Sequence, residues 1–265
     1  MSVVLVVEGT RDQQFFAQLV PYADRVNATV IPVSEIEIPP VEGGERGRAL
    51  WLASELQTDA EVRDRVFFFL DADVDHFLAA RYPASVILTD YSDFECYVLN
   101  ECSIRHMLVV FGGNSDQFVD VKGKLLELCR PIKAARVASH VLGLNLPMNY
   151  TLGADARDRF SRYIRGRGLD CTLDQKRLLG AVYSNASIAE DRRRQFERCL
   201  ASLEGTPLGE EHWAQGKDLT AAVAVVFRVA FQEAARLILS AILACCAAVV
   251  RTMPGIGRAE AILRS

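Results

Sequence analysis

The sequence has no Cys-x-x-Cys pair, and its seven cysteines are an odd number. Neither a zinc ribbon nor a disulfide framework is expected, so we interpret the cysteines as small apolar thiols in a reducing cytoplasm. No charged segment followed by a long apolar run opens the chain, so no signal peptide is expected. The longest charge-free apolar run, 237–250, is shorter than the ~20 residues of a membrane helix, and we expect no membrane span.

The sequence also lacks an excess of positive charge: 30 Lys and Arg residues stand against 34 Asp and Glu residues, a formal net charge of −4. This balance neither supports nor excludes a nucleic-acid partner, because a local basic groove is enough to steer a polyanion. Hydrophobic residues make up 50% of the 265 residues and charged residues 24%, which is the composition of a globular protein.

Short apolar runs alternate with amphipathic stretches in the first half of the chain. Strands are predicted at 3–7, 28–33, 66–70 and 85–88, with helices at 12–20 and 46–57. This alternation predicts an α/β domain over 1–110 with a Rossmann-like parallel sheet flanked by helices. In such sheets, ligands bind beyond the carboxyl ends of the strands.

The second half, 111–265, is predicted to be a mainly helical region that completes a site or mediates oligomer and partner contacts. Its expected helices span 121–141, 154–165, 173–179, 188–203 and 219–251. The last of these is very apolar. It is interpreted as buried core or as a partner-facing helix, through which we expect a homodimer.

Acidic residues cluster where two of the predicted strands end. Glu8 follows the first strand, whereas Asp71, Asp73 and Asp75 follow the third. Alternate residues of an extended segment point the same way, so Asp71 and Asp73 are expected to share one cation. Mg²⁺ (or Mn²⁺) prefers carboxylate oxygens, and such ions support in-line displacement at phosphodiesters. Glu8 could instead cap the following helix, and Asp75 is either a third ligand or a solvated helix-start residue.

Two segments carry a family resemblance. Val-Val-Glu-Gly-Thr-Arg-Asp at 6–12 and Phe-Leu-Asp-Ala-Asp-Val-Asp at 69–75 resemble the Toprim domain, over roughly residues 3–95. The Glu-Gly-x-x-Asp opening is similar to the OLD-type nuclease branch. The resemblance implies a metal-dependent nuclease with Glu8 as metal ligand or general acid/base, and with Asp71 and Asp73 as metal ligands.

Two fainter segments resemble an OLD-like family of Toprim proteins: 89–97, which contains Glu95, and the late motif His212…Gly-Lys-Asp-Leu at 216–219. Members of that family include the Toprim effector subunit of the PARIS anti-phage system. The resemblance implies an antiviral toxin effector that cleaves structured RNA such as tRNA, or DNA, and works with a partner ATPase.

The remaining candidate side chains have a structural interpretation beside the functional one. Asp12 is expected to fix the turn at Gly9 or to accept from a metal-bound water. Glu95 is expected either to bind the metal directly or from behind its ligands, or to cap a helix or lie on a solvated face. His212 is expected to assist proton transfer, or to be a hydrogen-bonded structural histidine. Lys217 is expected at the scissile phosphate, or simply exposed. The basic run is expected on a nucleic-acid backbone or on a solvated helix face; it comprises Arg192, Arg193 and Arg194.

Two other functions stay open on the sequence. Phe-Leu-Asp-Ala-Asp-Val is similar to the first motif of haloacid-dehalogenase phosphohydrolases, with Thr89 at the next strand end. Against this, the motif normally opens such a domain, whereas here an acidic strand end precedes it. A non-catalytic Toprim-fold regulatory subunit is the other alternative.

Overall fold

The first half of the chain forms the parallel sheet that the sequence predicts. The computed structural model describes residues 2–21, 24, 27–78, 80–144, 146, 162–186, 188–203, 205–245 and 250–265. The strands are β1 (Val3–Val7), β2 (Ala28–Pro32), β3 (Val66–Leu70) and β4 (Val86–Leu88). They lie in the order β2-β1-β3-β4, and every neighbouring pair is parallel. The prediction of an α/β fold with a Rossmann-like sheet is confirmed.

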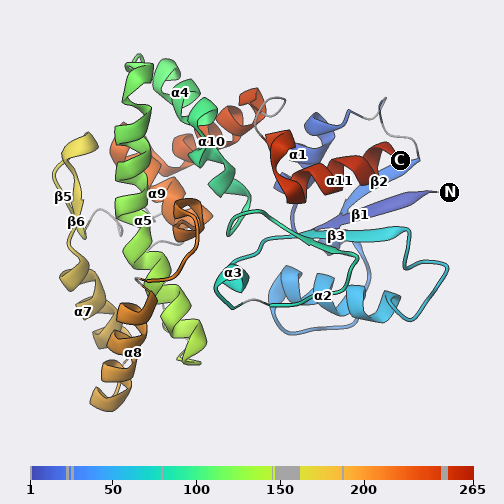
Figure 1. Cartoon of the computed structure of the whole chain (residues 1–265), viewed down its shortest axis with the longest axis horizontal. Coiled ribbons are helices and arrows are strands. Elements are labelled where there is room, and N and C mark those ends of the chain that lie inside the picture. The colour runs from blue at the N-terminus through green and yellow to red at the C-terminus, as the bar shows by residue number, and fades with distance from the viewer. Residues whose placement is uncertain are drawn as a thin grey trace.

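Helices cover both faces of this sheet (Figure 1). Alternate strand residues point to opposite faces, so Leu5 and Val7 pack with Phe16 of α1 (Thr10–Leu19). On the other face, Val6 packs with Ala49 of α2 (Gly44–Leu56). The short helix α3 (Asp75–Leu78) follows β3, and the 3₁₀ helix η3 (Phe94–Leu99) follows β4.

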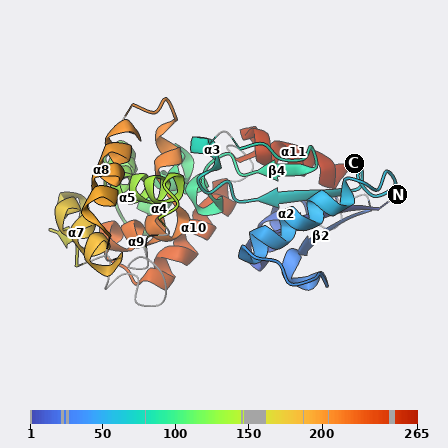
Figure 2. The ribbon, with the colours of Figure 1, turned by 90° about the horizontal axis from the view of Figure 1, so that it is seen from below.

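The helical region lies beside the sheet, so the molecule is elongated (Figures 1 and 2). Its helices are α4 (Glu101–Val110), α5 (Phe118–Val141), α7 (Gln175–Ala186), α8 (Glu190–Leu203), α9 (Gly216–Phe227) and α10 (Phe231–Cys245). Two short strands, β5 (Ile164–Arg165) and β6 (Thr172–Leu173), pair antiparallel at its outer end, and η7 (Glu210–Trp213) precedes α9.

The apolar stretch predicted as one helix over 219–251 is interrupted: its described residues up to 245 form α9 and α10, with a break between them. Arg228 has a φ of 60°, a left-handed conformation that ends α9 and turns the chain into α10. Ala221 to Ala224 are fully buried, so α9 is core, one of the two alternatives above. The helix predicted over 154–165 lies largely outside the described residues, and its last two residues form β5. No described helix is long and apolar enough to cross a membrane.

The C-terminal helix, α11 (Pro254–Arg264), packs against β1, β2 and β4 rather than within the helical region. Its apolar side, with Ile256, Ala259 and Leu263, is fully buried, and it covers the same face of the sheet as α1. The last residues of the predicted helical region therefore cover the sheet together with α1.

Two cysteines are joined. Cys102 of α4 and Cys245 of α10 form a disulfide, with their Cα atoms 5.9 Å apart. The expectation that all the cysteines are free thiols is wrong for this pair. The residues are 143 apart in sequence, and only the packing of α4 against α10 brings them together.

Replacing Leu263 with alanine tests the position of α11. We expect the free energy of unfolding to fall by about 2–5 kcal/mol, because the change leaves a cavity in the sheet core. Ile262→Ala is the control, since Ile262 is only half-buried on the same helix and should cost less. Urea unfolding followed by circular dichroism measures both. A cost for Leu263→Ala no larger than the control's would mean that α11 does not complete the core.

Candidate active site

The carboxyl ends of β1 and β3 lie side by side at the centre of the sheet. From β1 the chain crosses to β2 on one side, whereas β3 leads to β4 on the other. Open parallel sheets bind ligands at such a switch point. Glu8 Oε1 accepts a hydrogen bond of 2.9 Å from the Asp71 N–H. The first acidic residue after each of these two strands therefore lies at one crevice.

A cavity of about 390 Å³, here called the acidic cavity, opens at this crevice. Five carboxylates line it: Glu8, Asp12, Glu45, Asp71 and Glu95. Local contacts hold three of them. The Gly9 N–H donates to Asp12 Oδ2 at 3.0 Å, the turn contact that the sequence predicts. The Phe94 N–H donates to Asp71 Oδ1 at 3.2 Å, and Arg11 pairs with Glu95 at 3.2 Å.

Burial is the main reason why these carboxyl groups resist ionisation. It raises the pKa of Glu8 to about 7, and the charges of Asp73 and Asp12 add to the rise. Burial also raises the pKa of Asp12 to about 6. The pKa of Asp71 is raised well above its ordinary value by burial and then by the charge of Asp93. Carboxylates gathered in this way repel one another unless a cation neutralises them.

Asp73 lies apart from the other half of its Asp-x-Asp pair. Its φ of 46° is left-handed, so the chain after β3 is not extended, and Asp71 and Asp73 do not point the same way. Asp73 lines a second cavity of about 360 Å³, where its Oδ1 accepts from Gln215 Nε2 at 3.2 Å. The extended geometry expected for this pair is therefore wrong, although Asp73 still acts on Glu8 through its charge.

Asp75 is already neutralised by the protein. It begins α3, forms an ion pair with Arg46 and accepts a hydrogen bond of 2.8 Å from the Tyr82 hydroxyl. Arg46, on α2, also approaches Glu8, with 3.7 Å between Nη1 and Oε1. Asp75 thus holds the arginine that faces Glu8, and it is neither a solvated helix-start residue nor part of the acidic cavity.

No protein-family model matches the chain, and no curated protein matches it either.

Two buried residues beside the acidic cavity escaped the sequence analysis. Asp93 is almost fully buried, accepts from the Gly216 N–H and from the Cys96 thiol at 3.0 Å, and has a pKa raised by burial to about 7. Lys133 of α5 is fully buried and donates to the Asp73 carbonyl at 2.8 Å. Burial lowers the pKa of Lys133, while the charge of Asp93 opposes that shift. Its ammonium is the buried counter-charge of the site.

The late motif reaches the same place. A Cβ on Gly216 would lie 2.6 Å from Glu95 Oε2 and 3.0 Å from Asp93 Cγ, so a larger residue at the start of α9 would force these carboxylates to shift. Ser92 Oγ donates to the His212 carbonyl at 3.3 Å, and the His212 ring packs 4.5 Å from that of His76. The segments around residues 92–95 and 212–216, far apart in sequence, are thus in contact.

Lys217 and the basic run lie elsewhere. The Lys217 side chain is exposed on the first turn of α9 and is not among the residues that line the acidic cavity. Arg192, Arg193 and Arg194 are exposed on α8, at the far end of the helical region (Figure 1). Arg193 pairs there with Glu197 at 3.1 Å. The structure does not bring these four side chains to the acidic cavity.

The donor set fits a hard divalent cation in its chemistry. In the part of the chain that the structure describes, no three His, Cys, Asp or Glu side chains form a ready metal cluster. Glu8 and Asp71 each use one oxygen in the backbone contacts above, and a carboxylate offers about four lone-pair sites. Mg²⁺ and Mn²⁺ prefer such oxygens. Glu8 and Asp71 are the residues that would hold the ion, with Asp12 and Glu95 beside them.

The raised pKa of Glu8 predicts how stability varies with pH. Between its ordinary value of 4.5 and about 7, the unfolded chain loses the Glu8 proton while the folded protein keeps it, so rising pH destabilises the fold. We expect the Tm in EDTA to fall from about pH 5 to about pH 8, and Mg²⁺ or Mn²⁺ to restore it mainly at the higher pH. Thermal melts at both pH values measure this, and Glu8→Gln should reduce the fall, leaving the part that Asp12, Asp71 and Asp93 contribute. A metal effect equal at both pH values would contradict this account of the site.

Lys133→Met tests the buried counter-charge. Removing the ammonium leaves the buried Asp73 carbonyl without its donor and removes the positive charge that favours the ionised form of Asp93, so we expect the free energy of unfolding to fall by about 1–3 kcal/mol near pH 8. The loss should be smaller near pH 5, where Asp93 takes up a proton. Lys124→Met is the matched control, because Lys124 lies on α5 and pairs with the half-exposed carboxylate of Glu127. Urea unfolding at both pH values measures the difference, and equal losses for the two variants would contradict the role of Lys133 as the buried counter-charge.

Proposed function

We propose that the chain is a divalent-metal-dependent nuclease of the Toprim type that hydrolyses phosphodiesters of RNA or DNA. One observation carries the proposal: Glu8 from β1 and Asp71 from β3 meet at the switch point and line one acidic cavity. The resemblance of 6–12 and 69–75 to the Toprim domain supports the same pair of residues.

The residues divide the work as follows. Glu8 and Asp71 bind the cation, which when bound would neutralise charge on the reacting phosphate oxygens. Glu8 Oε1 is engaged by the Asp71 N–H, which leaves Oε2 to bind the cation or, in the other role that the resemblance implies, to accept or release a proton. Arg46, held by Asp75, stabilises the Glu8 carboxylate once it is ionised.

The biological setting rests on the OLD-like resemblance. That resemblance supports an anti-phage effector working with a partner ATPase, on tRNA or another structured RNA, or on DNA. The two segments that carry it contact each other at Ser92 and His212, and Gly216 lies against Asp93 and Glu95. The homodimer remains a proposal; α9, one half of the apolar stretch expected to face a partner, is buried within the chain.

The phosphohydrolase alternative finds less support. It needs the Thr89 hydroxyl to face the substrate beside Asp71. Thr89 is 1% exposed, and its hydroxyl accepts from the Ala72 N–H at 2.9 Å and donates to the Tyr91 carbonyl at 2.7 Å. A hydroxyl engaged in this way holds the loop after β4.

Glu8→Gln tests the nuclease. The substitution keeps the shape of the side chain but removes its charge and its proton exchange. We expect cleavage of labelled RNA and DNA in Mg²⁺ or Mn²⁺ to fall at least about 100-fold. Arg63→Ala, at an exposed position before β3 and so at the opposite edge of the sheet, should cleave as the wild type does. A circular-dichroism melt confirms that both variants fold.

The outcomes separate the three functions. Undiminished cleavage by Glu8→Gln would refute the assignment of the site. Release of phosphate from p-nitrophenyl phosphate without cleavage would favour the phosphohydrolase. Metal binding and association with an ATPase, with no turnover of any substrate, would favour the regulatory subunit.

A further inference from the structure

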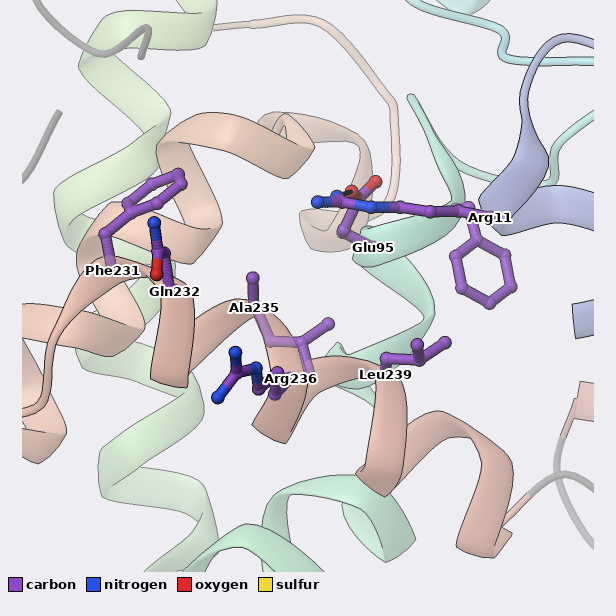
Figure 3. A pocket seen from close by; sticks show the side chains of 9 residues that line it. Arg11, Glu95, Phe231, Gln232, Ala235, Arg236 and Leu239 are labelled. Atoms are coloured by element: carbon purple, nitrogen blue, oxygen red, sulfur yellow. Dashed lines mark hydrogen bonds and ion pairs between the residues drawn. The ribbon is translucent and has the colours of Figure 1, made fainter. Parts of the chain in front are cut away.

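A third pocket, of about 260 Å³, lies between α10 and two other elements: α1, which carries Arg11, and η3, which carries Glu95 (Figure 3). Its apolar lining comprises Phe94, Phe231, Ala235, Ile238 and Leu239. Polar side chains also line it: Arg11, Glu95, Gln232 and Arg236. We call it the α10 pocket. In Figure 3, Phe231 and Gln232 lie on one side, and Arg11 and Glu95 lie opposite them.

The α10 pocket shares a wall with the acidic cavity. Arg11, Phe94 and Glu95 line both. The ion pair between Arg11 and Glu95 therefore stands between the two spaces. If one part of a ligand occupied the α10 pocket, the adjacent part of the same ligand would lie in the acidic cavity, beside Glu8 and Asp71.

The residues that line the pocket suit a ligand made of a flat aromatic ring and a negatively charged group attached beside that ring. Phe231 is half-buried and offers part of its ring to the pocket, while Phe94, almost fully buried, forms the wall behind. Arg236 is exposed, and the Arg11 side chain is 67% exposed, so both guanidinium groups are accessible to solvent. Guanidinium groups pair with phosphates and stack on bases, and aromatic rings stack on bases. The Gln232 amide adds a donor and an acceptor for the edge of a base.

We propose that the α10 pocket binds one unstacked nucleobase of a single-stranded nucleic acid, with its flanking phosphates at Arg11 and Arg236. The next phosphodiester then lies at the acidic cavity. This deepens the proposed nuclease function and rests on it for the identity of the bound strand as substrate. A base inside a continuous duplex is paired and stacked, so an intact duplex does not fill the pocket.

Binding tests the pocket independently of cleavage. The full chain is titrated into fluorescein-labelled 12-nucleotide single strands, one of RNA and one of DNA, and into the matching duplexes, in Ca²⁺, with anisotropy as the readout. We expect the wild type to bind single strands more tightly than the matching duplexes. The single strand that binds more tightly, RNA or DNA, identifies the type of nucleic acid that the pocket accepts. Phe231→Ala and Arg236→Ala should each weaken that binding roughly 5- to 100-fold and leave duplex binding unchanged.

Matched controls come from other surfaces. Phe111→Ala removes a partly exposed aromatic ring at the end of α4, and Arg63→Ala removes an exposed arginine that precedes β3, at the edge of the sheet opposite the acidic cavity. Both should bind as the wild type does. Ala235→Trp, which fills the pocket, should mimic Phe231→Ala, and thermal melts establish that each variant is folded. Because Arg236 is exposed, Arg236→Ala should not disturb folding. It therefore still tests the pocket if Phe231→Ala or Ala235→Trp fails to fold.

The outcomes for the pocket and for the nuclease are separate. If Phe231→Ala and Arg236→Ala bind single strands as the wild type does, the pocket proposal is overturned, whether or not the protein cleaves. If they lose binding while no preparation cleaves, the pocket stands and the nuclease fails. If the wild type binds no strand, the proposal that the α10 pocket binds a nucleobase is overturned.

Discussion

The crowding of carboxyl groups at the carboxyl edge of the sheet is the constraint on which the rest of the site depends. The pairing of β1 with β3 places Glu8 beside Asp71, and the turn after β4 adds Asp93. Burial makes each charge costly, and each neighbour adds repulsion. Two helices supply positive charges that oppose this repulsion: Arg46 of α2 lies near Glu8, and Lys133 of α5 interacts with the charge of Asp93.

This electrostatic requirement explains why the helical region is part of the site rather than an appendage. Lys133 can reach the Asp73 carbonyl only if α5 docks on the end of the sheet. A buried pair between Arg136 of α5 and Asp218 of α9, with both contacts at 3.0 Å, joins the two helices. The same docking brings Gly216 against Asp93 and Glu95. A displaced α5 would leave several buried charges uncompensated at once, so the two halves are energetically coupled.

The sequence predicts the parts of this arrangement that depend on local pattern. β1 and β3 have the predicted bounds, because continuous apolar runs permit little else, and parallel topology then brings Glu8 and Asp71 together. It does not identify Lys133, since nothing local separates a buried lysine from Lys124 on the same helix. The sequence does not predict the left-handed conformation of Asp73 for a related reason. That conformation is stabilised by hydrogen bonds to Ser92 and Lys133, which belong to other segments of the chain.

The two adjoining cavities follow from the same division between sheet and helices. The sheet supplies carboxylates, which suit a cation, whereas α10 supplies aromatic, aliphatic and guanidinium groups, which do not. The two sets meet at the ion pair of Arg11 and Glu95, where α1 and η3 approach α10. The disulfide between Cys102 and Cys245 ties α10 to α4, and α4 follows η3 with only Asn100 between them. Because η3 carries both Phe94 and Glu95, the spacing between the acidic cavity and the α10 pocket is set by a short, cross-linked length of chain. A ligand that spans both would therefore meet two subsites at a nearly fixed separation.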